Sequence, residues 1–116
     1  MGRFNDPRVL CQQISTLNPL WRSEYDIESV VKMNESTVRL CSRTHLFKIN
    51  IDITLNNSDL YDIKAYQIKE YGLWLALIYN EKDFYAESLD TVLQTIMEKA
   101  KQTKPEDYRP MEEFIK

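Results

Sequence analysis

Apolar residues first recur at helical spacing and then at every second position, and this change predicts the elements of the chain. Between residues 7 and 17 they lie three or four positions apart, which predicts an amphipathic helix. Asn5 or Asp6 can cap that helix, because short polar side chains accept hydrogen bonds from the first helical N–H groups. The pair Asn18-Pro19 ends it, and residues 20–25, which include Trp21, are expected to form a loop.

From residue 27 the apolar residues alternate with polar ones, as they do in strands with one face on a core and one in water. The alternation predicts four strands separated by polar turns, over about 27–33, 37–41, 47–55 and 60–69. It is strictest in the third strand, where five apolar residues alternate with four polar ones. A slip of phase at Ala65-Tyr66 in the fourth strand is typical of a β-bulge.

The segment Leu73–Lys101 carries the strongest pattern. Leu73–Tyr79 is apolar at nearly every position, which is typical of a central strand or one covered on both faces. A polar turn over 80–83, a short antiparallel strand over 84–86 and an amphipathic helix capped by Ser88 are expected to follow. The residues expected in the core of this unit are Trp74, Leu75, Leu77, Leu93 and Ile96.

These elements predict an α+β fold. Short polar connections favour an antiparallel meander of five to six strands, and the N-terminal and C-terminal helices are expected to pack on one of its faces. The 116 residues contain only two glycines and show no internal repeat, which favours one domain over residues 1–104. Residues 105–116 form an acidic, aromatic-containing tail that either docks on the domain or binds a partner.

Charge is unevenly spread along the chain. The net charge is −3, but residues 1–50 carry seven Lys/Arg against five Asp/Glu, whereas residues 51–116 carry eight against thirteen. The acidic second half favours a protein partner with a basic surface. The longest apolar run is too short for a membrane helix, and charged residues interrupt the N-terminus before any signal-peptide core, so we expect a cytoplasmic protein without a membrane partner.

No motif for catalysis, a cofactor or a metal stands out. Cys41 lies four residues before His45, the only histidine, but a strand thiol beside an exposed turn imidazole explains the spacing. Two distant cysteines and one histidine are too few for a zinc site. Two groups of carboxylates fall in predicted turns or on the polar strand face, where acidic residues are common: Asp52, Asp59 and Asp62, and Glu81, Asp83 and Glu87. We therefore expect a protein that is not an enzyme.

Nucleic-acid binding is the alternative function. Arg39, Arg43 and Lys48 are predicted to share the polar face of adjacent strands, where Tyr66 could add a stacking surface. The isoelectric point near 5.2 opposes this interpretation, and a solvated strand face explains the same charges.

Protein binding without chemistry is the leading hypothesis, because tyrosine and tryptophan in predicted loops and in the tail are typical of interfaces. The expected partner-binding residues are Glu106, Asp107, Tyr108, Glu112, Glu113 and Phe114. In size, acidity and lack of motifs the chain is similar to the small inhibitors that phages and mobile elements direct against host defence, and to immunity proteins that block toxins. That likeness implies an inhibitor or adaptor that covers a functional surface of its partner. An exposed sheet edge could also support a homodimer.

Overall fold

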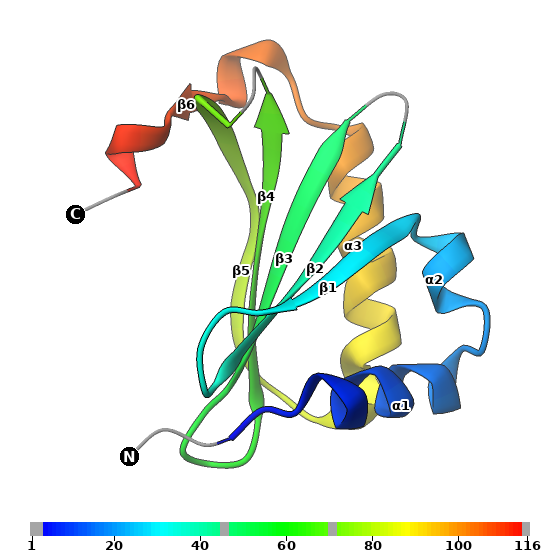
Figure 1. Cartoon of the computed structure of the whole chain (residues 1–116). Helices are drawn as coiled ribbons and strands as arrows, with labels where there is room; N and C mark the ends of the chain where they lie inside the picture. Colours follow the sequence, from blue (N-terminus) through cyan, green and yellow to red (C-terminus); the bar gives the residue numbers. More distant parts are fainter. Residues whose placement is uncertain (1–3, 45–46, 70–71, 115–116) are drawn as a thin grey trace.

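A computed structural model describes residues 4–44, 47–69 and 72–114. Six strands form one antiparallel sheet in the order β1-β2-β3-β4-β5-β6, so each strand pairs with the one before it in sequence (Figure 1). The strands are β1 (Ile27–Lys32), β2 (Thr37–Arg43), β3 (Lys48–Leu55), β4 (Tyr61–Lys69), β5 (Trp74–Phe84) and β6 (Arg109–Pro110). The α-helices are α1 (Pro7–Leu17), α2 (Trp21–Glu24) and α3 (Leu89–Lys101). The predicted α+β meander is confirmed.

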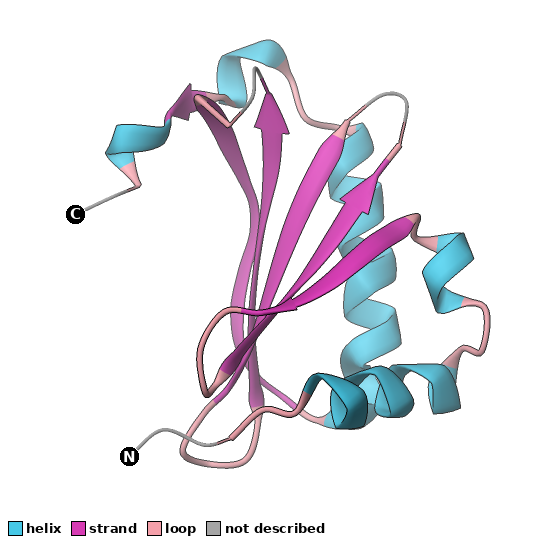
Figure 2. Cartoon of the chain, viewed as in Figure 1, coloured by secondary structure: helices cyan, strands magenta, loops and turns pink. Residues whose placement is uncertain are grey.

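The helices lie on one face of the sheet and leave the other face open (Figure 2). The core fills the space between α1, α3 and the sheet, and it is made mainly of alternate residues from β2, β3 and β4 together with one stripe each of α1 and α3. Its largest fully buried apolar side chains are Leu10, Ile14, Val38, Leu40, Ile49, Ile51, Ile53, Ile63, Leu89, Leu93 and Ile96. The alternation predicted for residues 47–55 therefore agrees with the structure, in which Ile49, Ile51 and Ile53 are fully buried.

The two residues proposed as helix caps have different roles. Asp6 caps α1, because its side chain accepts a hydrogen bond of 2.9 Å from the backbone N–H of Arg8. Asn5 is buried instead, and its side-chain amide donates to the carbonyl oxygens of Ser36 at 3.2 Å and Ile53 at 3.0 Å. Asn5 thus fastens the N-terminal segment to the β1–β2 turn and to β3.

The sequence predicts a loop over residues 20–25, and this is wrong in part. Trp21–Glu24 forms the short helix α2. Trp21 is only 2% exposed, and its indole N–H donates to the Ser15 hydroxyl at 2.9 Å. Burial of this large side chain requires the chain to turn back onto the core directly after Pro19, which favours a single helical turn.

The prediction of a turn over 80–83 followed by a strand over 84–86 is wrong. β5 is one strand of 11 residues that pairs with β4 along its whole length. The pairing with β4 continues through the polar residues 80–83 with two register irregularities, one next to Ile78 and one near the end of the strand. The bulge expected at Ala65-Tyr66 is present in the register, but the extra residue belongs to β5: Ala65 pairs with Tyr79 and Tyr66 with Leu77.

β5 is also not a central strand covered on both faces. Among the described residues only the two of β6 pair with its outer edge, and Trp74 and Leu77 are 38% and 44% exposed. Their predicted place in the core is therefore wrong, and Leu75 is only half-buried. Leu93 and Ile96 are fully buried in α3, as predicted. Burial in the core therefore does not explain the apolar run Leu73–Tyr79, since several of its side chains are exposed at this edge of the sheet.

Candidate protein-binding surface

The segment after α3 crosses the edge of the sheet and lies against β5 (Figure 1). It consists of two 3-10 turns, η2 (Pro105–Asp107) and η3 (Met111–Glu113), with β6 between them. β6 places Arg109 opposite Leu75 and Pro110 opposite Trp74. The backbone N–H of Met111 then donates to the carbonyl of Leu73 at 2.9 Å. The tail is therefore docked on the domain through backbone pairing.

Both aromatic residues that the sequence assigned to partner binding face this chain's own sheet. The ring of Phe114 meets that of Tyr66 edge to face, with centroids 5.4 Å apart and an interplanar angle of 79°. The ammonium of Lys69 lies 5.4 Å from the ring centroid of Tyr108, and burial raises the pKa of the Tyr108 hydroxyl. Each ring is half-buried, so these contacts leave part of it open to a partner.

The four carboxylates assigned to the same site remain exposed. Glu106 and Asp107 lie in η2, and Glu112 and Glu113 lie in η3. Asp107 caps its own turn by accepting a hydrogen bond from the backbone N–H of Lys104 at 2.8 Å. Within the described part of the chain none of the four forms an ion pair, so their charge is available to a basic partner.

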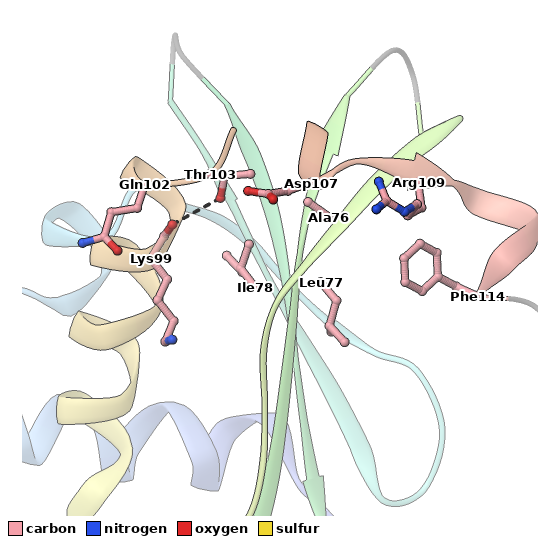
Figure 3. Close-up of a pocket in the computed structure, with 9 residues that line it drawn as sticks. All are labelled: Ala76, Leu77, Ile78, Lys99, Gln102, Thr103, Asp107, Arg109 and Phe114. Atoms are coloured by element: carbon pink, nitrogen blue, oxygen red, sulfur yellow. Dashed lines mark hydrogen bonds between the residues drawn. The ribbon is translucent and has the colours of Figure 1, made fainter. Parts of the chain in front are cut away.

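Exposed apolar side chains lie next to these carboxylates. Leu73 is 61% exposed and Met111 is 40% exposed, and their backbones are hydrogen-bonded to each other. Leu77 extends the apolar area along β5, on the side of the strand that faces Phe114 (Figure 3). We call this set the tail surface: Leu73, Leu77 and Met111, with the carboxylates of Glu106, Asp107, Glu112 and Glu113. Sequence reasoning missed its apolar members because it assigned Leu77 to the core and made no prediction for the exposure of Leu73. Trp74 is exposed as well, but alternation places it on the other side of β5, with the buried Ala76.

A hollow of about 520 Å³ lies where the tail leaves the edge of β5 (Figure 3). Leu77 and Phe114 lie on one side of the β5 ribbon, and Ile78 and Lys99 lie on the other. The full lining is Ala76, Leu77, Ile78, Lys99, Gln102, Thr103, Asp107, Arg109 and Phe114. The hollow therefore joins the tail surface to the end of α3.

The basic residues assigned to the nucleic-acid alternative lie on the open face of the sheet. Arg39 makes two hydrogen bonds to Asp52 on the next strand, at 2.7 and 3.0 Å, and the first of these is also an ion pair. Hydrogen bonding to Asp52 raises the pKa of the Arg39 guanidinium. Arg43 and Lys48 are exposed and stand opposite each other in the β2–β3 register. Two cations therefore remain for a phosphate backbone, and the third is neutralised within the sheet.

The other polar candidates of the sequence lie apart from the tail or have structural partners, as far as the described residues show. Cys41 is half-buried in β2, and His45 lies outside the described residues. Asp62 accepts hydrogen bonds from the Asn56 side chain at 2.9 Å and from the backbone N–H of Asp83 at 3.1 Å, so it stabilises the ends of β4 and β5. Over residues 4–44, 47–69 and 72–114, no cluster of three or more acidic, cysteine or histidine side chains could hold a metal ion.

Comparison with known proteins gives no assignment. No protein-family model, no curated protein and no solved structure matches the chain. Among the described residues, no helix combines the length and the hydrophobicity needed to cross a membrane.

Proposed function

We propose that the chain is a non-enzymatic protein-binding module that engages its partner through the tail surface. The observation that carries the proposal is the exposure of three large apolar side chains, Leu73, Leu77 and Met111, beside four carboxylates without an ion pair among the described residues. Contact of the Leu73 and Met111 side chains with water costs free energy that binding recovers, at roughly 25 cal/mol for each Å² buried.

The arrangement resembles an interface in its anatomy. Protein interfaces have an apolar centre and a polar rim, and Trp, Met and Tyr are enriched in them. The tail surface has an apolar centre at Leu73, Leu77 and Met111, and its carboxylates lie on the flanking 3-10 turns. A complementary partner presents an apolar knob surrounded by lysine and arginine, which agrees with the acidic second half of the chain.

We propose that the protein acts through this binding as an inhibitor or an adaptor. The tail surface is built on backbone pairing with a six-stranded sheet, so it is presented rigidly and loses little conformational entropy on binding. A rigid, acidic surface without a catalytic group acts by covering a basic functional surface on another protein. Inhibitors of host defence and toxin-blocking immunity proteins work in this way.

Affinity capture with matched variants tests the proposal. The full chain is immobilised as wild type, as a Leu73→Asp and Met111→Asp double variant, and as the control Leu20→Asp. Leu20 is 70% exposed just before α2, away from the tail, so its substitution changes charge and exposed apolar area without touching the tail surface. Circular dichroism of each protein checks that all three are folded.

The proposal expects at least one protein from a lysate of the source organism to be retained by the wild type and by Leu20→Asp, and to be lost from the double variant. The same protein should be eluted by salt, because carboxylates of the rim contribute to binding. Retention of an identical set of proteins by all three baits would show that the tail surface is not the binding site.

A further inference from the structure

One row of side chains crosses the open face of the sheet at the level of the tail. Residues that stand directly opposite each other on neighbouring strands share a face of the sheet. The row lies on the open face, because the residues next to it along the strands are buried and alternate residues point to opposite faces: Ser42, Ile49, Gln67 and Ala76. The register joins the row across five strands, from β2 to β6, through Arg43, Lys48, Ile68, Leu75 and Arg109.

The row is basic at one end and apolar in its middle. Arg43 of β2 and Lys48 of β3 are exposed, and over the described ranges neither forms an ion pair. Ile68 of β4 and Leu75 of β5 follow them, and both are half-buried. The parallel row one step along the strands adds Tyr66 and Leu77, which also stand opposite each other. β4 and β5 therefore present an apolar centre next to two free cations.

The turn η3 supplies an acidic end beyond β6. It lies on the side of the sheet away from α3 (Figure 1), and Phe114 holds it against Tyr66 of the open face. Glu112 and Glu113 are exposed on this turn, and neither forms an ion pair within the part of the chain that the structure describes. The row therefore runs from cations through apolar residues to carboxylates.

The cations near the tail leave its end of the row acidic. Arg109 donates to the carbonyl oxygens of Glu106 at 2.6 Å and Tyr108 at 3.0 Å, so its guanidinium is held by the tail itself. Lys69 lies over the ring of Tyr108 and, as the neighbour of Ile68, points to the helix side of the sheet. Residues 105–114 carry four carboxylates against the one cation of Arg109, a net charge of −3.

The carboxylates near the other end leave it basic. Glu28 of β1 lies one strand beyond Arg43 and forms no ion pair with it, so Arg43 and Lys48 against Glu28 give a net charge of +1. Asp26 lines a hollow with residues of α3 and so lies on the helix side. Asp52 is paired with Arg39. Three further charged residues line a separate hollow toward the far ends of the strands: Asp62, Lys64 and Lys82.

A row with opposite charges at its two ends is complementary to a second copy of itself turned through a half-rotation. A two-fold axis parallel to the strands, between β4 and β5, places Ile68 of one copy against Leu75 of the other and Tyr66 against Leu77. The same axis places Arg43 and Lys48 against η3 of the other copy. Every contact then occurs twice, as in the interfaces of two-fold dimers. Each copy also offers the apolar centre and the cations that the tail surface requires of a partner.

The size of this surface indicates a weak dimer. From β2 to β6 the strands span about 19 Å, at about 4.8 Å for each spacing, and the two rows lie about 7 Å apart along the strands. Stable interfaces bury about 800 Å² on each partner, and smaller ones are typical of transient association. We therefore expect a dimer that exchanges with the monomer and forms at high protein concentration.

We propose that the open face of the sheet binds a second copy of this chain in a two-fold dimer, with Arg43 and Lys48 of each copy against Glu112 and Glu113 of the other. The inference does not rest on the proposed function. The dimer shares Leu77 and the carboxylates of η3 with the tail surface, so self-association competes with the capture of another protein.

Charge reversal at the two ends of the row tests the inference with the full chain. One variant carries Arg43→Glu and Lys48→Glu, and the other carries Glu112→Lys and Glu113→Lys. All four side chains are exposed, so circular dichroism should show both variants folded. Sedimentation velocity of the wild type should show a dimer whose fraction rises with protein concentration and falls with salt. Each variant should weaken the dimer by about tenfold or more, because like charges then face each other.

A mixture of the two variants separates the proposed contact from a general effect of charge. The reversed basic end of one variant matches the reversed acidic end of the other, and the two unchanged ends still match each other. An equimolar mixture should therefore dimerise about as well as the wild type, and so should a chain that carries all four substitutions. The control Glu28→Gln, which changes charge one strand outside the row, should not weaken the dimer.

A wild type that stays monomeric over the whole concentration series overturns the inference, as does a mixture that fails to restore the dimer. Association that continues beyond the dimer also contradicts it, because an open-ended contact has no two-fold axis. A monomer that still captures a lysate protein through Leu73 and Met111 would remove the dimer and leave the proposed function in place. A dimer without such capture would do the reverse.

Discussion

Phe114 packs edge to face on Tyr66, and this contact holds the end of the tail against the open face of the sheet. The two residues are 48 positions apart in sequence, and they join η3 to β4 across β5. The contact means that the tail is presented to a partner in one fixed place. It also means that the tail contributes to the stability of the domain.

Removal of residues 105–116 should leave a folded but weakened domain. Deletion removes the Phe114–Tyr66 contact, worth about 0.5–1.5 kcal/mol beyond area burial, and the β6 hydrogen bonds at about 1 kcal/mol each. The core between α1, α3 and the sheet is unchanged. Urea unfolding should therefore show a cooperative transition with the free energy of unfolding lowered by about 2–4 kcal/mol. An unfolded deletion variant would show that the tail is part of the core.

The corrected positions of two leucines can be checked by a matched pair of substitutions. Leu93→Ala should lower the free energy of unfolding by about 2–5 kcal/mol, because Leu93 is fully buried in α3. Leu77→Ala should lower it by less than about 1 kcal/mol, because the Leu77 side chain is 44% exposed. Thermal and urea unfolding measure both. Equal losses would restore Leu77 to the core.

Tyr25 should make stability fall at high pH. Its hydroxyl donates to Asp90 at 2.7 Å, and burial followed by this hydrogen bond raises its pKa to about 12 from the ordinary value of 10.0. The neutral form is favoured in the folded state, so the stabilisation is complete below pH 10 and is lost as pH rises from 10 to 12. The loss is up to about 3 kcal/mol.

The Tyr25→Phe variant supplies the control for that titration. It keeps the buried ring and removes the hydroxyl, so the absorbance step of tyrosine ionisation near pH 12 should lose the contribution of one tyrosine. Stability near pH 7 should fall by about 1 kcal/mol through loss of the hydrogen bond to Asp90. Loss of that contribution near pH 10 in place of pH 12 would show that Tyr25 ionises with the exposed tyrosines.

Nucleic-acid binding should be weak or absent. Arg39 is paired with Asp52, which leaves Arg43 and Lys48 as the exposed members of the predicted basic face. Two phosphate contacts give a shallow salt dependence. Titration of single-stranded and double-stranded oligonucleotides at low salt should detect no saturable binding. Tight binding that falls steeply with salt, and that disappears in the Arg39, Arg43 and Lys48 triple alanine variant, would favour the alternative function.

An element can be predicted from the sequence when the burial and exposure of its own side chains set its pattern of apolar and polar residues. The alternation over residues 47–55 arises because β3 has one face on the core and one in water, so each side chain carries the signal. The stripe of α3 that includes Leu93 and Ile96 does the same at helical spacing. In both cases the pattern and the packing have the same physical cause.

The errors fall where distant segments decide the outcome. An apolar run such as Leu73–Tyr79 has the same composition in a central strand and at an edge that carries a docked tail, so its neighbours cannot be deduced from it. β6 has only two residues, too few for any periodicity, and its pairing depends on where the chain returns after α3. The pairing of β6 with β5 and the tail surface are therefore visible only in three dimensions.

Site-specific photo-crosslinking in cells of the source organism tests the central claim most directly. A benzophenone amino acid is placed at position 73 or 111 of the tail surface, and at position 20 as the control. The account predicts a discrete adduct with the same partner protein from positions 73 and 111, and none from position 20. An adduct of the same partner from position 20 alone would contradict it.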